Sequence, residues 1–244
     1  MSIKIKNLIS VILPTFNRGN FLAPCIDKIL ESDYSEKELI VVNDASTDNT
    51  SDILLQYKNH SNLKIINLKK NSNTVCIPRN IGISHSSGEF IAHADDDVIT
   101  HKKKFTILTE LLSNNVLCPL AYGNRRERWK DGFTKVAQFI PSWNPNVRTG
   151  IDNGQILYRS SVYNHIPFVW FYRACDSYLS KEIFNKIGSF CCTTEVVSTY
   201  LWHDNNRSLT TDHLYNHLKT QEIPQHIIDS FKEYINDEYF NNFI

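Results

Sequence analysis

LISVILPTFNR, residues 8–18, is a continuous apolar and β-branched run that ends in proline and polar residues. A strand that is buried on both faces has this composition, and such strands are typical of parallel sheets. Runs of the same kind follow at 39–43 and 63–68, and the segment EFIAHA at 89–94 adds a fourth. The sequence therefore predicts four buried parallel strands in its first 100 residues.

Helical patterns separate these strands, with predicted helices at 19–32, 49–58 and 77–85. In the first of them Leu22 and Ile29 belong to an apolar set that recurs at helical spacing, so one face packs on the sheet. Strands that alternate with helices predict an α/β domain with a mostly parallel central sheet and right-handed crossovers. Ligands of such sheets bind beyond the carboxyl ends of the strands.

The second half of the chain is less regular. After a predicted helix at 102–113, residues 118–142 form a predicted hairpin with Arg125, Arg126 and Arg128 at its bend, and 143–172 are aromatic and rich in turn formers. The last predicted elements are a helix at 176–187, a strand at 189–199 and two short helices at 209–220 and 224–238. This half resembles the loop-rich side of an α/β domain, which commonly shapes a substrate site.

Composition and charge exclude several classes of protein. The chain has 244 residues, 41% of them hydrophobic, which suits one folded domain. Lys+Arg and Asp+Glu are equal at 26 each, so the broad positive field of a nucleic-acid binder is missing. The six cysteines show no C-x-x-C spacing, which indicates reduced and mostly buried thiols.

Hydropathy predicts no transmembrane segment. The N-terminal apolar run is about six residues long, too short for a signal-peptide core or a bilayer span. We therefore expect a cytoplasmic protein. Apolar positions in the C-terminal segment 231–244 leave three uses open, which are closing the core, pairing protomers and touching a membrane surface.

Three adjacent carboxylates, Asp95, Asp96 and Asp97, follow the fourth predicted strand directly. They would repel one another unless a cation or solvent relieved the repulsion. Hard oxygen ligands favour Mg²⁺ or Mn²⁺, which bind through one or two carboxylates together with substrate phosphates. The alternative is an acidic loop that caps the next helix.

Four segments in order, SVILPTFNR, VVNDASTD, PRNIG and the strand ending in DDD, resemble the family 2 glycosyltransferases. These are inverting enzymes of the GT-A fold. The resemblance covers residues 8–112 and implies a single domain with two halves. Residues 1–115 would bind the nucleotide sugar, and residues 116–244 would bind the acceptor and include the C-terminal helices.

The resemblance assigns a nucleotide-sugar site to the ends of the strands. It implies that Asp44 contacts the base and that Arg79 faces the diphosphate, a role that suits a guanidinium. The wall of the nucleotide site would be formed by Pro14, Thr15, Asn17 and Arg18. Without the resemblance, Asp44 is an Asx turn or a helix cap and Arg79 a surface ion pair.

The resemblance also assigns the metal and the general base. Asp97 would ligate Mn²⁺ or Mg²⁺ directly, Asp95 would contact the ribose or a metal-bound water, and Asp96 is the intervening residue. Asp176 would be the base, with a helix N-cap as the alternative and Glu195 in reserve. His203 would reach the metal or the diphosphate, or would only bond within its loop.

These assignments predict an inverting glycosyltransferase that uses a nucleotide-diphosphate sugar, such as a UDP-sugar, and a hydroxyl acceptor on a glycan or glycoconjugate. We expect a monomer or homodimer. The alternatives are a catalytically silent nucleotide- or carbohydrate-binding module and a nucleotidyltransferase. A Rossmann dehydrogenase and a P-loop enzyme are disfavoured, because neither G-x-G-x-x-G nor G-x-x-x-x-G-K-[ST] occurs.

Overall fold

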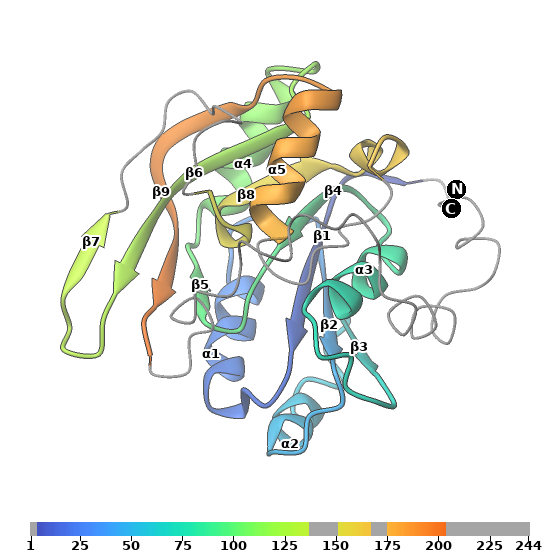
Figure 1. The fold of residues 1–244 in the computed structure, drawn as a ribbon, viewed down its shortest axis with the longest axis vertical. Coiled ribbons are helices and arrows are strands. Elements are labelled where there is room, and N and C mark those ends of the chain that lie inside the picture. Colours follow the sequence, from blue (N-terminus) through green and yellow to red (C-terminus); the bar gives the residue numbers. More distant parts are fainter. Residues whose placement is uncertain (1–3, 137–150, 167–174, 204–244) are drawn as a thin grey trace, which may run out of the picture.

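The computed structural model describes residues 4–136, 151–166 and 175–203. Within these ranges nine strands form one sheet in the order β3-β2-β1-β4-β8-β6-β9-β5, and β7 pairs with β6 (Figure 1). The α/β fold predicted from the sequence is confirmed.

The first half of the sheet is parallel, as predicted. Its strands are β1 (Ile5–Thr15), β2 (Lys37–Asn43), β3 (Leu63–Asn67) and β4 (Gly88–His93). β1 lies between β2 and β4 and pairs in parallel with both. Since both neighbours run in the same direction as β1, the carboxyl ends of these strands meet at one edge of the sheet.

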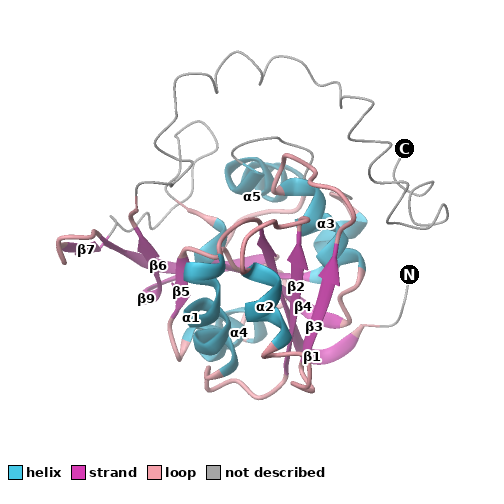
Figure 2. Ribbon diagram, turned by 90° about the horizontal axis from the view of Figure 1, so that it is seen from below, coloured by secondary structure: helices cyan, strands magenta, loops and turns pink. Residues whose placement is uncertain are grey.

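Helices cover both faces of this sheet (Figure 2). Side chains of α3 (Cys76–Ser84) and α5 (Cys175–Lys186) belong to one core layer. Side chains of α1 (Gly19–Leu30), α2 (Thr50–Leu55) and α4 (Lys104–Ser113) belong to the other. Successive residues of β1 serve the two layers in turn, as the side-chain alternation of a strand requires.

Gly82 allows α3 to approach β1 closely. A Cβ atom at this position would lie 2.5 Å from Cγ2 of Ile12, which is fully buried. Overpacking of this kind forces backbone shifts, so we expect Gly82→Ala to lower the free energy of unfolding by about 1–3 kcal/mol. Urea denaturation measures this loss. Ser84→Ala in the same helix is the control and should change stability by less than about 0.5 kcal/mol; equal losses would contradict the packing argument.

The second half adds strands that pair antiparallel with their neighbours, except that β6 and β9 pair in parallel. These are β5 (Val98–Thr100), β6 (Leu120–Arg128), β7 (Thr134–Val136), β8 (Ile156–Arg159) and β9 (Cys191–Leu201). The predicted hairpin appears as β6 and β7, and the predicted helix and strand after residue 175 appear as α5 and β9.

The sequence analysis missed β5 and β8 and the short 3₁₀ helices Asn153–Gln155 and Ser160–Asn164. β5 has three residues and β8 has four, and each is held by distant partners, β9 for β5 and β4 with β6 for β8. A pattern within so short a segment cannot reveal a pairing across 34 to 102 residues. The predicted helices at 209–220 and 224–238 lie outside the described residues.

The cysteine prediction is corrected at one pair. Cys118 and Cys191 form a disulfide between the segment before β6 and the start of β9, with Cα atoms 6.2 Å apart. Adjacent strands place the two residues together, since Cys191 pairs with Ala121. Cys25 and Cys76 are buried and belong to no disulfide, as expected. No helix in the described ranges is both long and apolar enough to cross a bilayer.

Candidate active site

The candidate site lies where β1, β2 and β4 end. The Asp44 N–H donates to the Thr15 carbonyl at 2.9 Å, so the ends of β2 and β1 are in contact. Asp95, Asp96 and Asp97 form the turn between β4 and β5. The site residues predicted at strand ends are therefore neighbours in space.

β9 brings His203 to the acidic turn. Leu201 N–H donates to the Asp97 carbonyl at 2.9 Å, and Val98 pairs with Tyr200. His203 lies two residues after Leu201, and its Nε2 is 3.5 Å from Oδ2 of Asp97. A contact across 106 residues of chain thus joins the histidine and the aspartate that the sequence analysis had linked to one metal.

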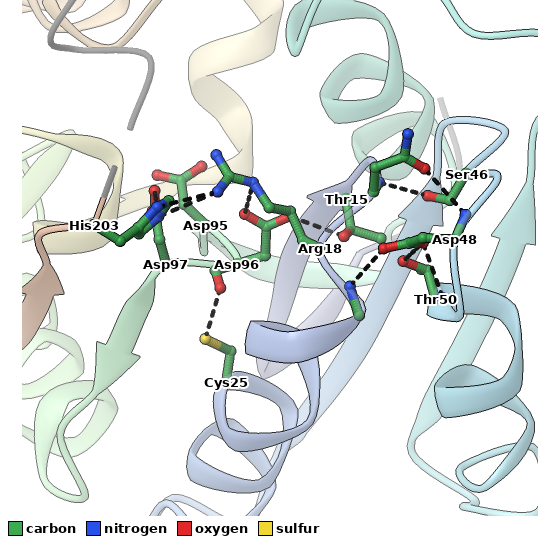
Figure 3. A network of polar contacts seen from close by, with 12 residues as sticks. Thr15, Arg18, Cys25, Ser46, Asp48, Thr50, Asp95, Asp96, Asp97 and His203 are labelled. Atoms are coloured by element: carbon green, nitrogen blue, oxygen red, sulfur yellow. Dashed lines mark hydrogen bonds and ion pairs between the residues drawn. The ribbon is translucent and has the colours of Figure 1, made fainter. Parts of the chain in front are cut away.

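Arg18 and Phe21 hold the His203 ring in place. Nη1 of Arg18 lies 3.2 Å from Nε2 of His203, and the Phe21 ring stacks on the imidazole with centroids 4.6 Å apart. Figure 3 shows Arg18 between His203 and the carboxylate of Asp96. Sequence analysis missed Phe21, which directly precedes the first buried apolar position of α1.

Asp96 points toward β1 and away from Asp97. Its Oδ2 accepts from Thr15 Oγ1 at 2.8 Å, its Oδ1 is 3.9 Å from Arg18 Nε, and its carbonyl accepts from the Cys25 thiol at 3.2 Å (Figure 3). Burial raises the pKa of Asp96 to about 6, against the opposing effect of the Thr15 hydrogen bond and the Arg18 charge. The side chain acts here as a link between the acidic turn and the β1–α1 loop.

Arg79 is a buried residue, so the surface ion pair considered for it is wrong. It is 1% exposed, and its Nη2 donates to Oδ1 of Asp95 in an ion pair. This guanidinium comes from α3, the helix whose Gly82 allows close packing against β1. The positive charge therefore lies beside the acidic turn at the strand ends.

Asp44 is buried and bonded within the protein. Its carboxylate accepts from the Ser72 N–H at 2.9 Å, from Ser72 Oγ at 2.8 Å and from Asn71 Nδ2 at 3.1 Å. These bonds fasten the 69–74 loop to the end of β2. A nucleotide base that contacted Asp44 would have to share this carboxylate with Ser72 and Asn71.

Asn17 connects two loops at the edge of the site. It has a positive φ of 53°, a conformation that asparagine tolerates, and its Oδ1 accepts from the Thr47 N–H at 2.7 Å. Asp48, in the same loop, accepts from the Gly19 N–H at 3.1 Å and from the Thr50 N–H at 3.0 Å (Figure 3). Pro14 is buried near the end of β1, opposite Val42. The loops beside Pro14 and Asp44 are thus fixed by their own side chains.

Asp97 in the turn and His203 after β9 lie close enough to share a divalent cation, provided that Nη1 of Arg18 gives up its contact with Nε2 of His203. Two neighbouring ligands of an octahedral ion with bonds of about 2.1 Å stand about 3 Å apart, close to the 3.5 Å between His203 and Asp97. Among the described residues, no three His, Cys, Asp or Glu side chains are grouped as a closed metal cage. Mg²⁺ and Mn²⁺ take few protein ligands and complete their shell with water and phosphate oxygens.

The two candidate bases differ in what the structure shows. Asp176 occupies the first turn of α5, and its side chain lies outside the described residues. Glu195 is exposed on β9, where its N–H donates to the Thr193 hydroxyl at 3.2 Å. The base assignment is therefore still a prediction.

A second group of buried charges lies beside the acidic turn, and sequence analysis missed it. Lys104 is 1% exposed and donates to the Gly154 carbonyl at 2.8 Å, while Arg125 pairs with both Asp152 and Glu127. Lys104 lies within electrostatic range of Asp95 and Asp152. Helical spacing could have indicated the burial of Lys104, because this residue shares a helix face with the buried Leu108 and Leu112.

The buried Lys104 should make the free energy of unfolding depend on pH. Burial lowers its pKa to about 8, from 10.5, with Asp152 and Asp95 opposing the shift. Between these values the unfolded chain binds more protons than the folded protein, so stability rises with pH across the window. We expect a rise of roughly 2–3 kcal/mol, at 1.36 kcal/mol per pKa unit. Urea denaturation from pH 7.5 to 10.5 in EDTA should show it as a difference between the wild type and a variant without this ammonium, because the raised pKa of the buried Cys25 thiol lowers stability in the upper part of the same window.

Lys104→Met should remove this rise, because no group replaces the ammonium. Lys103→Met, at the exposed neighbouring position, is the control and should keep the rise. If both variants followed the wild-type curve, Lys104 would not be the titrating group.

Comparison with known proteins places the chain in a family. It matches glycosyl transferase family 2 over residues 10–179, more than half of its length. The chain belongs to glycosyl transferase family 2. The matched range begins in β1 and contains the acidic turn and the first turn of α5.

Curated relatives match part of the chain. Poly(ribitol-phosphate) beta-N-acetylglucosaminyltransferase TarS of Staphylococcus aureus is 35% identical over 96 residues, which are 38% of this chain and 17% of TarS. Glycosyltransferase GlyG of Streptococcus pneumoniae is 33% identical over 104 residues, 43% of this chain and 35% of GlyG. The family 2 chain thus spans well under two thirds of these relatives.

Solved structures confirm the GT-A-type fold. The structure of S. aureus TarS 1–349 in complex with UDP-GlcNAc has a TM-score of 0.71 at 20% identity, covering 97% of this chain and 73% of that one. The mannosyltransferase PcManGT of Pyrobaculum calidifontis, in complex with GDP-Man and Mn²⁺, has a TM-score of 0.65 at 14% identity, with 93% and 69% covered. At these identities the likeness concerns the fold alone.

Proposed function

We propose that this protein is an inverting glycosyltransferase that moves a sugar from a nucleotide-diphosphate donor, such as a UDP-sugar, to a hydroxyl of a glycan or glycoconjugate. The observation that carries the proposal is the pair of Asp97 and His203 beside the Arg79–Asp95 ion pair, at the strand ends of a family 2 chain. A cation would bind Asp97 and His203 there, and the negative phosphate groups of the donor would face Arg79.

The donor would lie across the ends of β1, β2 and β4. Pro14, Thr15, Asn17 and Arg18 supply the wall of the nucleotide site, and Asp44 accepts from the base. Residues 1–115 thus form the nucleotide-sugar half of the domain and 116–244 the acceptor half. TarS, whose fold this chain shares, is known in complex with UDP and with UDP-GlcNAc, which supports a uridine nucleotide as the first donor to test.

Mn²⁺ or Mg²⁺ would be held by Asp97 and His203, with Asp95 near the ribose or a metal-bound water and Asp96 as the link to β1. When bound, the ion neutralises charge that develops on the leaving diphosphate. Arg79 contributes to the same end from α3, because its guanidinium is already buried and oriented before the donor arrives.

Transfer is a single displacement. The acceptor oxygen bonds to the anomeric carbon as the bond from that carbon to the phosphate oxygen breaks, and the configuration inverts. Asp176 takes the acceptor proton, and the nucleoside diphosphate leaves with the electron pair of the broken bond. Asp176 stands in the first turn of α5, a helix whose Leu179 and Ile183 share a core layer with α3, the helix that carries Arg79.

The surroundings of the reaction follow from the same proposal. A nucleotide-sugar donor is a cytoplasmic metabolite, so we expect the protein to act in the cytoplasm, as a monomer or homodimer. Peripheral contact with a membrane is compatible with a lipid-linked glycoconjugate as acceptor.

Calorimetry tests the donor site. We expect UDP to bind with Mn²⁺ and to bind far more weakly in EDTA, and a UDP-sugar to be hydrolysed slowly by the Mn²⁺-loaded protein without acceptor. Metal-dependent binding without any turnover across a panel of donors would favour the silent binding module. Absence of binding to every nucleotide sugar tested would remove the transferase proposal altogether.

A further inference from the structure

The β6–β7 hairpin projects from the body of the protein, at the left of Figures 1 and 2. It starts in the shared sheet and continues beyond its edge, where β6 is paired with β7 on one side and β9 on the other. Trp202, the residue before His203, donates its backbone N–H to the Arg128 carbonyl at 2.8 Å. The outer end of β6 is therefore attached directly to the end of β9 that leads to His203.

Four aromatic rings form a row along one face of this projection. Phe133 contacts Trp129 with centroids 5.2 Å apart, Trp129 stacks on Trp202 at 5.9 Å, and Trp202 meets Tyr200 at 5.2 Å. Strand register explains the row, because Glu127 is paired with Tyr200 and side chains alternate between faces. The row begins at the exposed tip, where Phe133 is 58% exposed, and ends beside the site.

The hairpin is also positively charged. Arg126, Arg128, Lys130 and Lys135 are exposed on it, against a single exposed acid, Asp131. The whole chain has equal numbers of acidic and basic residues, so this excess is a local property. Arg125, at the inner end, is already paired with Glu127 and Asp152 and belongs to the buried group near Asp95.

We propose that the aromatic face of the hairpin, defined by Phe133, Trp129, Trp202 and Tyr200, binds the acceptor, and that this acceptor is an anionic glycan chain. This inference rests on the proposed function, since it concerns the acceptor of that reaction. Flat aromatic faces offer apolar area to the C–H faces of sugar rings. Lys135, which pairs with Glu127, shares the aromatic face, while Arg126 and Arg128 lie on the other face of the same thin ribbon. Together these exposed bases attract phosphate, carboxylate or sulfate groups on the chain.

The continuity of the row with the site favours a glycan over a membrane surface. A bilayer-binding tip needs apolar side chains that point outward together, whereas Trp129 and Trp202 are stacked on one another and partly buried. A chain laid along the row from Phe133 inward would arrive next to His203. That path would deliver a hydroxyl to the place where the donor sugar is expected.

Binding can be measured with defined probes. Dextran sulfate and neutral dextran of equal length test for an anionic glycan, inorganic polyphosphate tests for charge alone, and anionic phospholipid vesicles test for a membrane. We expect dextran sulfate to bind more tightly than the other three, and its affinity to fall with rising salt. Tighter binding of polyphosphate or vesicles, or equal binding of neutral dextran, would overturn the proposal.

Variants separate the two parts of the surface. Replacing all four exposed hairpin bases with serine should weaken dextran sulfate binding about tenfold or more. Phe133→Ser and Trp129→Ser should also weaken dextran sulfate binding but leave polyphosphate binding unchanged. Phe133 is exposed, so its variant keeps the test valid if Trp129→Ser is unstable. Serine at four exposed lysines far from the hairpin provides the matched control: Lys6, Lys28, Lys58 and Lys64.

Acceptor-independent hydrolysis of the UDP-sugar distinguishes failure of this inference from failure of the proposed function. Hairpin variants should hydrolyse the donor at the wild-type rate, because they do not touch the donor site. The acceptor surface would be refuted if the variant without the four bases and the two aromatic variants still hydrolysed the donor but bound dextran sulfate as tightly as the wild type. If the wild type hydrolysed no donor, the proposed function would fail even where the probe bound.

Discussion

Asp97→Asn should weaken Mn²⁺-dependent binding of UDP at least about a hundredfold and abolish measurable sugar transfer. The substitution keeps the shape of the side chain and removes the anionic ligand opposite His203. The Asp97 carbonyl that accepts from Leu201 is retained, so the β5–β9 pairing should survive. Calorimetry with UDP and Mn²⁺, together with a donor hydrolysis assay, gives the two readouts.

Asp52→Asn is the matched control for this variant, because Asp52 is exposed on α2. It should bind UDP as the wild type does. Thermal unfolding in EDTA checks that both variants are folded. Full metal-dependent binding by a folded Asp97→Asn protein would remove the aspartate from the metal site.

Asp176→Asn should lower the rate of transfer by about 10²–10⁴, the usual contribution of a general base. Donor affinity should be unchanged, because the base acts on the acceptor hydroxyl and not on the nucleotide. The measurement is kcat for transfer to a hydroxyl acceptor, with UDP binding followed separately. A loss in both quantities would indicate a structural role at the start of α5.

Glu195→Gln tests the reserve candidate against Asp176. Glu195 is exposed on β9 and should be replaceable with little change in kcat. If Glu195→Gln reduced transfer strongly while Asp176→Asn did not, the base would have to be reassigned to β9.

Much of the fold could be predicted because its strongest signals are local. The β1 run and the three similar runs after it are buried on both faces, and the helices between them carry one apolar face each. Their order leaves few topologies open. β5 and β8 were missed because their ladders depend on partners far away in the chain.

The candidate site was predictable in part for the same reason. Asp44, Arg79 and the three aspartates stand at the ends of predicted elements, so the topology alone places them at one edge. The contacts of His203 with Asp97, Arg18 and Phe21 arise only when β9 pairs with β5. The buried Lys104 and the half-buried Arg125 became visible as a group only through the fold.

The amino-acid sequence by itself determined the kind of sheet and the edge at which ligands bind, because hydrophobic periodicity and strand order act over a few residues. Only the tertiary structure decided which polar groups meet there and which are already bonded. Asp44 is fastened to Ser72, Asp96 is turned toward Thr15, and Asp97 faces His203. Such pairings depend on strand register and helix packing across the whole chain, which no local pattern encodes.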